Sequence, residues 1–330
     1  MTLRDPERIA IGVVGCGHFG RFHALKAAAE SEFRLIGVND ARAERGAKLG
    51  AEVGVASLSW PEILAASDAV VIATPADSHF ALARQALEAG RHVLVEKPIA
   101  ATLAEADILA ALAAEHAMVL QVGHLERFSA AFRALVPHMR KPVYIEAVRI
   151  QPFKERGTDV SVVLDLMIHD LDLVLALVAS PIESVDAVGA SVASRHEDIA
   201  NARIRFVNGC VATITASRVS LRTERRMRLF NQGGYVSVDF VNRKLALISA
   251  GANGTPLPGL PGYRLTESAW QNHDSLAAEH AAFAAAVTGK GPVVVDARAG
   301  RDALAAALMV SESMAQSRAR ATASGLLVPG

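Results

Sequence analysis

Residues 9–20 of the chain read IAIGVVGCGHFG, and this short stretch decides the fold of the residues around it. Its first half, Ile9–Val14, is short, apolar and rich in β-branched residues, which is typical of a strand buried on both faces of a parallel sheet. Its second half has glycines at the spacing G-x-G-x-x-G, and a segment of helical period follows at 19–29. A strand that passes through a glycine turn into a helix predicts the first unit of a doubly wound α/β sheet.

Beyond this unit the alternation of strand and helix continues to about residue 124. Four further apolar runs predict parallel strands at 34–38, 69–73, 92–95 and 119–122. The segments between them have helical period and predict helices at 42–49, 78–89 and 103–116. The last of these helices opens with a capping box, Thr102-x-x-Glu105. We therefore expect an N-terminal Rossmann domain over residues 1–124.

The pattern changes after residue 124. One helix is expected at 161–178, and two more close the chain at 274–287 and 297–318. The strand-like segments between them lie at 185–192, 202–206, 210–217, 227–231, 235–240 and 244–249. Turn residues between these segments favour antiparallel pairing. We expect a C-terminal α+β domain over residues 125–330, built on a mostly antiparallel sheet.

Composition and charge exclude several classes of function. The 330 residues carry 34 Lys+Arg and 34 Asp+Glu, so no charge imbalance favours binding to nucleic acid or to an anionic membrane. No apolar run approaches the ~18 residues that span a bilayer, and the charged start, MTLRDPER, does not resemble a secretion signal. Cys16 and Cys210 are the only cysteines, which excludes a disulfide framework and suits a reducing compartment. The expected location is the cytoplasm.

The glycine turn has the residues that a dinucleotide-binding site requires. Gly15 permits the tight turn, Gly17 lets the backbone approach a pyrophosphate, and Gly20 lets the helix pack on the strand. His18 and Phe19 lie at the start of the helix, where free N–H groups and the helix dipole favour phosphate. The alternative interpretation is a glycine turn that holds no ligand.

Asp40 supplies a second and independent signal. It lies at the end of the second strand, 20 residues after Gly20. An acid at this position hydrogen-bonds the hydroxyls of the adenine ribose and repels a 2′-phosphate, which favours NAD over NADP. Arg42 and Arg45 follow closely and could accommodate the extra phosphate, so NADP stays possible. Asp40 could also be an ordinary turn aspartate.

The sequence Glu96-Lys97-Pro98 follows the strand at 92–95, at the carboxyl edge of the sheet where α/β proteins bind ligands. Pro98 disfavours a helical conformation for Lys97 and stiffens the turn. Such a turn could aim the lysine ammonium group into the crevice. The alternative is a solvated lysine at the end of a strand.

The helix expected at 161–178 carries the sequence DLMIHDLD at residues 165–172. Asp165, His169 and Asp172 are spaced four and three residues apart, so they share one face beside the buried apolar stripe. A histidine flanked by carboxylates is held in orientation and has its proton affinity raised, as a general base for an alcohol requires. The alternatives are a salt-bridged surface histidine and a metal site. Because no convincing third ligand group lies nearby in the sequence, we expect no metal.

Together these motifs resemble the glucose–fructose oxidoreductase / inositol dehydrogenase / rhizopine catabolism (Gfo/Idh/MocA) family. The resemblance covers most of the chain and includes the glycine turn, Asp40, Ala-Thr-Pro at 73–75, Glu-Lys-Pro at 96–98 and the Asp-x-x-x-His of the helix. It implies a dehydrogenase that acts on CH–OH groups with NAD as its cofactor. It also implies an open-faced C-terminal sheet that builds homodimers or homotetramers.

By this resemblance Lys97, Asp165 and His169 form the catalytic triad. His169 accepts the proton of a sugar hydroxyl, Lys97 donates a hydrogen bond to the reacting oxygen, and Asp165 orients the base or the substrate. Hydride passes from the sugar carbon to C4 of the nicotinamide.

The resemblance also adds residues to the cofactor site. Thr74, Pro75 and His79 line the nicotinamide side, and Glu96 lies against the cofactor ribose beside Lys97. The expected cofactor site thus extends from the glycine turn along the carboxyl ends of the strands.

Two local sequences narrow the resemblance to one branch of the family. GHLERF at 123–128 and DLMIHD at 165–170 resemble the branch that contains UDP-N-acetylglucosamine 3-dehydrogenases, whose 3-oxo product passes to an aminotransferase in lipid A-type amino-sugar biosynthesis. His124 and Arg127 would then bind substrate together with Asp165 and His169. Arg127 is a plausible contact for a nucleotide-sugar phosphate, or else a structural arginine.

Two other functions stay open. One is a dehydrogenase of a free sugar or a cyclitol such as inositol, whose pocket would not need to hold a diphosphate. The other is a non-catalytic NAD-binding regulator. The presence of Lys97, Asp165 and His169 together argues against a regulator, because a sensor of NAD has no need of a base.

Overall fold

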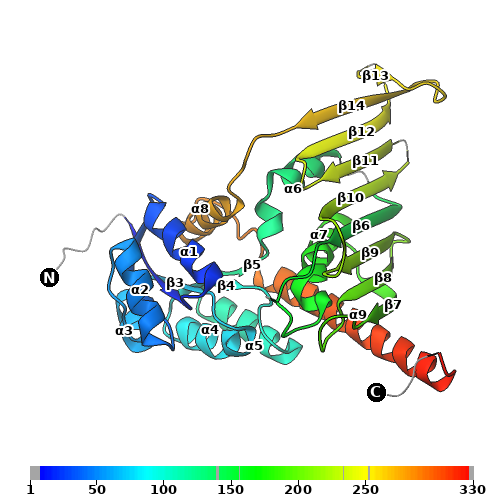
Figure 1. Ribbon diagram of the computed structural model, residues 1–330. Coiled ribbons are helices and arrows are strands. Elements are labelled where there is room, and N and C mark those ends of the chain that lie inside the picture. Colours follow the sequence, from blue (N-terminus) through cyan, green and yellow to red (C-terminus); the bar gives the residue numbers. More distant parts are fainter. Residues whose placement is uncertain (1–7, 139–140, 156, 233, 252, 327–330) are drawn as a thin grey trace. The chain divides into compact units, whose positions relative to one another are not determined.

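The computed structural model describes residues 8–138, 141–155, 157–232, 234–251 and 253–326 (Figure 1). Most of the charged start of the chain, residues 1–7, lies outside these described residues. Within them, no helix is both long enough and apolar enough to cross a membrane.

Two compact units make up the chain. The first comprises Met1–Phe128 and Asp274–Leu304, and the second comprises Ser129–His273 and Ala305–Gly330. The division expected from the sequence, 1–124 and 125–330, did not include this return of the chain to the first unit. The return has a physical reason, because Phe283 and Ala284 are 0% and 1% exposed in the same apolar core as Ile11 and Phe33.

In the described part of the first unit, five strands form one parallel sheet, which confirms the predicted Rossmann fold. They are β1 (Ile9–Val14), β2 (Phe33–Asn39), β3 (Ala69–Ile72), β4 (His92–Glu96) and β5 (Leu120–Gly123). Their order in the sheet is β2-β1-β3-β4-β5. The chain therefore changes direction across the sheet between β1 and β3, which is the point where open α/β sheets bind ligands.

Helices connect these strands. They are α1 (His18–Ala29), α2 (Ala43–Val53), α3 (Trp60–Ala66), α4 (His79–Glu88) and α5 (Leu103–Glu115), with a short 3₁₀ turn η1 (Ala76–Ser78) before α4. The 3₁₀ turn η2 (Leu125–Phe128) follows β5, and α8 (Ser275–Val287) joins the unit after β14. The predicted capping box of α5 is present, since the Glu105 amide donates to Thr102 Oγ1 at 3.2 Å and the Thr102 amide donates to Glu105 Oε2 at 3.0 Å. Helix α3 was not predicted, although Ser59 and Glu62 form a capping box there too.

The second unit contains a mostly antiparallel sheet, as predicted. Its described strands are β6 (Tyr144–Ile150), β7 (Ile182–Ala190), β8 (Ile199–Phe206), β9 (Val211–Ser217), β10 (Glu224–Asn231), β11 (Gly234–Asp239), β12 (Lys244–Ala250), β13 (Thr255–Pro256) and β14 (Tyr263–Ala269). Their order is β13-β14-β12-β11-β10-β6-β9-β8-β7. Strand β6, which was not predicted, pairs antiparallel with β10 and parallel with β9. The sheet is therefore mixed at its centre.

Helices lie along one face of this sheet (Figure 1). They are α6 (Ala130–Leu135) with η3 (Val136–His138), the π-helical turn η4 (Val163–Met167), α7 (Ile168–Val178) and the C-terminal part of α9 (Ala297–Ala323). On β6, Ile145 and Ala147 are 0% exposed, whereas the alternate residues Tyr144 and Glu146 stay partly exposed. This alternation shows that the sheet is covered on one face and open on the other.

Candidate active site

The glycine turn between β1 and α1 has the geometry of a phosphate-binding loop. Gly15 has a φ of +94°, and a Cβ there would lie 2.5 Å from the Ala73 carbonyl oxygen, so only glycine fits. A Cβ on Gly20 would lie 1.6 Å from the Gly15 oxygen, because α1 packs directly on the turn. At Gly17 a Cβ would meet nothing within 4 Å, and this residue caps α1 without a side-chain hydrogen bond. The open space and the helix N-terminus therefore fit a diphosphate.

Asp40 ties the end of β2 to the glycine turn. Its Oδ2 accepts a hydrogen bond from the Cys16 amide at 2.7 Å, and its Oδ1 accepts one from the Arg42 amide at 2.8 Å. A carboxylate can accept further hydrogen bonds, so ribose hydroxyls fit as additional donors. Burial, and after it the charge of Asp40, raise the pKa of the Cys16 thiol to about 11, which keeps this thiol protonated at neutral pH.

His18 and Phe19 begin α1 and form an aromatic group beside the turn. The His18 ring meets Phe19 at 5.9 Å and Phe22 at 4.9 Å between ring centroids, in both cases edge-on. The two phenylalanines are 39% and 37% exposed, which is unusual for side chains of this size. Such rings are suited to cover one side of a bound nucleotide.

His79 links the loops that follow β3 and β4. Its ring is 1% exposed, with Nδ1 2.8 Å from the Pro98 carbonyl oxygen and Nε2 2.9 Å from the Thr74 carbonyl oxygen. The Ser78 hydroxyl lies 2.7 Å from both Thr74 Oγ1 and the Pro75 oxygen. The structure therefore shows His79 holding the loops of the expected nicotinamide side in place.

A buried chain of polar side chains runs from Glu96 into the core of the first unit. Glu96 Oε1 lies 2.9 Å from His23 Nε2, and His23 Nδ1 lies 2.9 Å from His280 Nε2. Both imidazoles are 0% exposed. Burial by itself would raise the pKa of Glu96, but the hydrogen bond and charge of His23 outweigh it and lower that pKa. Burial lowers the pKa of His280 well below its usual value, which keeps this ring neutral.

Glu279 precedes His280 on α8 and belongs to the same polar cluster. It is 0% exposed, and neither carboxyl oxygen has a hydrogen-bond partner among the described residues. Burial, and after it the charge of Glu96, raise the pKa of Glu279 well above its usual value. In the cluster of His23, Glu96, Glu279 and His280, the pKa values of the two carboxyl groups are therefore shifted in opposite directions, down for Glu96 and up for Glu279.

Lys97 and the residues that follow β5 lie at the carboxyl edge of the same sheet. Lys97 is half-buried, and its amide donates to Glu96 Oε2 at 3.2 Å. Gly123 pairs with Glu96 across the two strands, and a Cβ on Gly123 would lie 3.1 Å from the Glu96 carboxylate. His124 is 1% exposed, whereas Arg127 in η2 is half-buried. Of these two, Arg127 has the more accessible side chain for a substrate.

Asp165 and His169 lie in the second unit, on a helix that differs from the expected one. The sequence predicted one α-helix at 161–178, but Val163–Met167 form a π-helical turn and α7 begins at Ile168. The prediction of an uninterrupted α-helix was therefore wrong. Asp165 lies in the middle of the π-turn, and both it and His169 are half-buried. Single π-turns within helices are frequent at functional sites.

Two further aspartates of α7 are buried. Asp170 is 4% exposed and forms two hydrogen bonds with Arg149 of β6, at 2.7 Å from Nε and 3.1 Å from Nη2. This bidentate pair attaches α7 to the sheet. Asp172, expected to share a face with His169, is 1% exposed and so is less accessible than Asp165.

The expected site residues fall into two groups. The first extends from the glycine turn to Arg127 and lies within the first unit, at and beyond the carboxyl ends of its strands. Asp165 and His169 form the second group, within the second unit. A meeting of Lys97 with this second group stays a prediction. Among the described residues, no group of three or more His, Cys, Asp or Glu side chains is arranged to hold a metal ion.

The residues that hold the expected site residues in place were not predicted from the sequence. His23 lies on the buried side of α1 with Gly20, Ala24 and Ala27, and a polar residue among small apolar ones was the only local signal. Its partners Glu96 and His280 are 73 and 257 positions away. No local pattern connects residues at such separations.

Comparison with known proteins agrees with the motifs. Residues 9–124 match the family described as "Oxidoreductase family, NAD-binding Rossmann fold", and residues 122–237 match the GFO/IDH/MocA C-terminal domain. The UDP-N-acetylglucosamine 3-dehydrogenase of Acidithiobacillus ferrooxidans is 45% identical over 301 residues, which cover 91% of this chain and 95% of the relative. The scyllo-inositol 2-dehydrogenase (NAD(+)) of Bacillus subtilis is 26% identical, over 88% of this chain and 90% of the relative.

A solved structure extends the comparison to three dimensions. UDP-N-acetylglucosamine 3-dehydrogenase GnnA from Acidithiobacillus ferrooxidans matches with a TM-score of 0.88 and 43% identity, covering 93% of this chain and 97% of that one. The family resemblance noted in the sequence is thereby confirmed. The chain belongs to the Gfo/Idh/MocA family of NAD-binding oxidoreductases.

Proposed function

We propose that the protein is an NAD-dependent dehydrogenase that oxidises the 3-hydroxyl of UDP-N-acetylglucosamine to a ketone. The observation that carries this proposal is the 45% identity, over 91% of the chain, to a relative named for that reaction. The scyllo-inositol dehydrogenase relative reaches only 26% over a similar length. Lys97, Asp165 and His169 supply the base and the hydrogen-bond donor that such an oxidation needs.

The first unit has the residues to bind the cofactor. NAD, when bound, supplies the acceptor for the hydride. The glycine turn and the N-terminus of α1 bind its pyrophosphate, and Asp40 accepts hydrogen bonds from the adenine ribose. Glu96, held ionised by His23 at 2.9 Å, accepts a hydrogen bond from the second ribose.

Oxidation of the hydroxyl group removes a hydride from its carbon and a proton from its oxygen. The carbon–hydrogen bond breaks with its electron pair, while His169 takes the proton of the hydroxyl, so the carbonyl forms without a charge left on its oxygen. Lys97 donates a hydrogen bond to that oxygen and stabilises charge that develops there. Asp165 holds His169 in the orientation that this transfer requires. Arg127 binds the diphosphate of the substrate, and His124 shapes the pocket behind it.

Turnover with defined substrates tests this proposal. The protein is mixed with NAD and UDP-N-acetylglucosamine, NADH is followed by its absorbance, and hydroxylamine is added to trap the ketone. N-acetylglucosamine without the nucleotide and myo-inositol serve as substrate controls. His169→Ala serves as the protein control, because it removes the base while leaving the cofactor residues of the first unit unchanged.

We expect NADH to form with the sugar nucleotide, and mass spectrometry to show the oxime of a ketone that is itself two hydrogens lighter than the substrate. NADH with myo-inositol alone would instead identify a cyclitol dehydrogenase. If NAD binds but neither the sugar nucleotide nor the cyclitol reduces it, the protein is a regulator and the proposed reaction is wrong. Unchanged turnover in His169→Ala would remove His169 from the mechanism.

We also propose that the protein forms homodimers or homotetramers through the open face of its second-unit sheet. Tyr144, Phe230 and Tyr235 form a ladder of rings on neighbouring strands, 5.7 and 4.9 Å apart, and Val188 on β7 is 57% exposed. Apolar side chains on an open sheet face suit association. Sedimentation velocity of the wild type and of Val188→Glu measures this, and a monomer in both would exclude the assembly. The free thiols of Cys16 and Cys210 fit a cytoplasmic location.

A further inference from the structure

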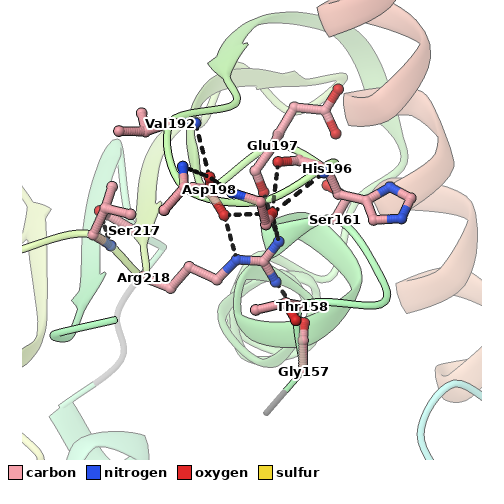
Figure 2. Close-up of polar contacts among 12 residues, drawn as sticks. Gly157, Thr158, Ser161, Val192, His196, Glu197, Asp198, Ser217 and Arg218 are labelled. Carbon is pink, nitrogen blue, oxygen red and sulfur yellow. Dashed lines mark hydrogen bonds and ion pairs between the residues drawn. The ribbon is translucent and has the colours of Figure 1, made fainter. Parts of the chain in front are cut away.

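Arg218 and Asp198 form a fully buried ion pair that the proposed chemistry does not use (Figure 2). Arg218 follows β9 and Asp198 precedes β8, and their side chains are 1% and 0% exposed. Arg218 Nε donates to Asp198 Oδ1 at 2.8 Å. Burying two charges costs more free energy than their attraction returns unless further hydrogen bonds satisfy both groups. The surrounding backbone must therefore satisfy the remaining donors and acceptors.

Asp198 organises the loop between β7 and β8. Its Oδ2 accepts hydrogen bonds from the amides of Val192, Ala193 and Ser194 at 2.8, 2.7 and 2.9 Å. Its Oδ1 also accepts one from the Ser194 hydroxyl at 2.7 Å. Burial by itself would raise the pKa of Asp198, but these donors and Arg218 outweigh it and hold that pKa well below its usual range. The loop is therefore built around a permanent negative charge.

Arg218 joins this loop to a second segment of the chain. Its Nη2 donates to the Ser194 hydroxyl at 3.0 Å and to the Glu197 carbonyl oxygen at 3.4 Å. Its Nη1 donates to the carbonyl oxygen of Gly157, and Figure 2 shows the guanidinium between the loop and Gly157. A planar guanidinium can bind all these acceptors at once, whereas a lysine ammonium group is a single point of charge.

Gly157 in turn packs against the carboxylate of Asp165. It has a φ of +81°, and a Cβ at this position would lie 2.9 Å from Asp165 Oδ2 and 3.1 Å from Oδ1. The same loop also holds the other end of the segment, since the Val162 amide donates to the Glu197 oxygen at 2.9 Å. Gly157 and Val162 both precede the π-turn at Val163–Met167, which carries Asp165 at its centre. Both contacts therefore fix the position of Asp165.

We propose that Arg218 and Asp198 are positioning residues that hold Gly157 against Asp165 and thereby set the geometry of the π-turn. The inference rests on the proposed function, in which Asp165 orients His169. An apolar pair of similar volume would fill the core as well, and replacing a buried ion pair in this way is often neutral for stability. It would, however, leave the carbonyl of Gly157 without its donor and release the segment that Arg218 holds.

Gly157→Ala is the sharpest test, with Gly209→Ala as its matched control. Gly209 lies in the same unit with a φ of +88°, but a Cβ there would meet nothing within 4 Å. Both variants carry a similar backbone strain, and only Gly157→Ala pushes on Asp165. We expect kcat with UDP-N-acetylglucosamine to fall at least about tenfold in Gly157→Ala, since a misplacement of about 1 Å can cost about 100-fold. The Kd for NAD should change less than about twofold.

Arg218→Lys tests the hydrogen bonds by which Arg218 holds Ser194, Glu197 and Gly157. Lysine keeps the charge opposite Asp198 but cannot bind Ser194, Glu197 and Gly157 together. We expect kcat to fall about tenfold, with the NAD Kd unchanged and a cooperative thermal unfolding transition. If this variant does not fold, Gly157→Ala still decides the question, because it leaves the ion pair intact.

A double-mutant cycle separates positioning from general destabilisation. In the background of Asp165→Ala the carboxylate that Gly157→Ala would push is absent, so the second substitution should lower kcat no further. A second full loss of kcat in that background would overturn the inference. So would equal kcat values in Gly157→Ala and Gly209→Ala.

A measurement without turnover distinguishes this inference from the proposed function. In protein labelled at histidine, the His169 ring signals are identified by their loss in His169→Asn. We expect them to shift in Gly157→Ala and Arg218→Lys, but not in Gly209→Ala. If the wild type does not oxidise the sugar nucleotide, the proposed function fails while this shift still supports the positioning role. If Asp165→Ala loses activity but the His169 signals do not shift in either Gly157→Ala or Arg218→Lys, the positioning role alone fails.

Discussion

Asp198 in the second unit and Glu279 in the first are both completely buried, yet their pKa values are shifted in opposite directions. Asp198 accepts hydrogen bonds from three backbone amides, a hydroxyl and a guanidinium. The carboxyl group of Glu279 accepts none among the residues that the structure describes. Because burial raises the pKa of both carboxyl groups, the difference shows that the donors around a buried carboxylate, rather than its depth, decide the direction of its pKa shift.

The two first-unit carboxylates that the proposed chemistry uses have fewer hydrogen-bond donors around them than Asp198 and more than Glu279. Glu96 keeps its charge through His23 and the Lys97 amide, and Asp40 keeps two backbone amides as donors. Each therefore has capacity left for a ligand. Asp198 has five protein donors and so serves the fold rather than a ligand.

Asp198→Ala should give the largest effect on stability. It leaves the guanidinium of Arg218 buried without its counter-charge, and we expect the free energy of unfolding to fall by about 3–5 kcal/mol. Urea denaturation measures this. Arg222→Ala is the control, because Arg222 pairs with Glu224 at 2.9 Å on the surface with 77% of its side chain exposed. Its loss should cost less than about 1 kcal/mol, and a similar loss in the two variants would contradict the comparison.

His23→Ala should have the next largest effect. It removes the histidine that keeps Glu96 ionised, and we expect the free energy of unfolding to fall by about 2 kcal/mol because a buried carboxylate loses its partner. The NAD Kd should rise about tenfold, as Glu96 takes up a proton more readily. His116→Ala, at the end of α5 in the same unit, is the control. Unchanged NAD binding in His23→Ala would mean that Glu96 does not contact the cofactor.

Glu279→Gln should stabilise the protein in a manner that depends on pH. The pKa of Glu279 is raised in the folded state, so folding requires a proton once the pH exceeds the ordinary value of 4.5. The wild type therefore loses stability as pH rises from that value toward the folded pKa, by about 1.4 kcal/mol for each pH unit. Glutamine does not titrate and should remove this slope. Thermal unfolding of both proteins between pH 4 and pH 8 measures it, and parallel curves would show that Glu279 is ionised.

Asp40→Ala should produce the smallest change. The carboxylate of Asp40 accepts hydrogen bonds from two backbone amides and is proposed to accept further ones from the adenine ribose. Without it, we expect the preference for NAD over NADP to fall about fivefold, or about 1 kcal/mol. Isothermal titration with each cofactor measures the two Kd values. An unaltered ratio would mean that another residue distinguishes the two ribose groups.

The local features of the fold could be predicted from the sequence. Strand β1 was predicted with its observed bounds, Ile9–Val14, because apolar pattern and glycine turn act over a few neighbouring residues. Strand β6 also alternates between buried and half-buried residues, but it is defined by pairing with β9 and β10, far along the chain. The alternation in YIEAVRI is a strand pattern by itself, and only the position of β6 between β9 and β10 depends on distant parts of the chain. The return of α8 to the first unit depends on long-range packing that no short window contains.

The residues of the candidate site also divide into those with a local sequence pattern and those that depend on distant partners. Residues in contiguous motifs, such as Gly15 and Lys97, could be named from the sequence. The residues that hold them, such as His23 and Arg218, could not, because each acts through partners distant along the chain. The π-turn around Asp165 was missed for a related reason, since the apolar spacing of this helix is equally compatible with an uninterrupted α-helix.

The late position of α8 in the sequence has a consequence for synthesis on the ribosome. All strands of the parallel sheet have been made by Gly123, yet Phe283 and His280, which pack against Phe33 and His23, come about 160 residues later. At typical elongation rates of ~5–20 residues per second, the nascent nucleotide-binding core waits roughly 10–30 seconds for its last helix. During that interval its apolar surface is exposed to chaperones, and a shortened chain ending at residue 128 would keep it exposed permanently.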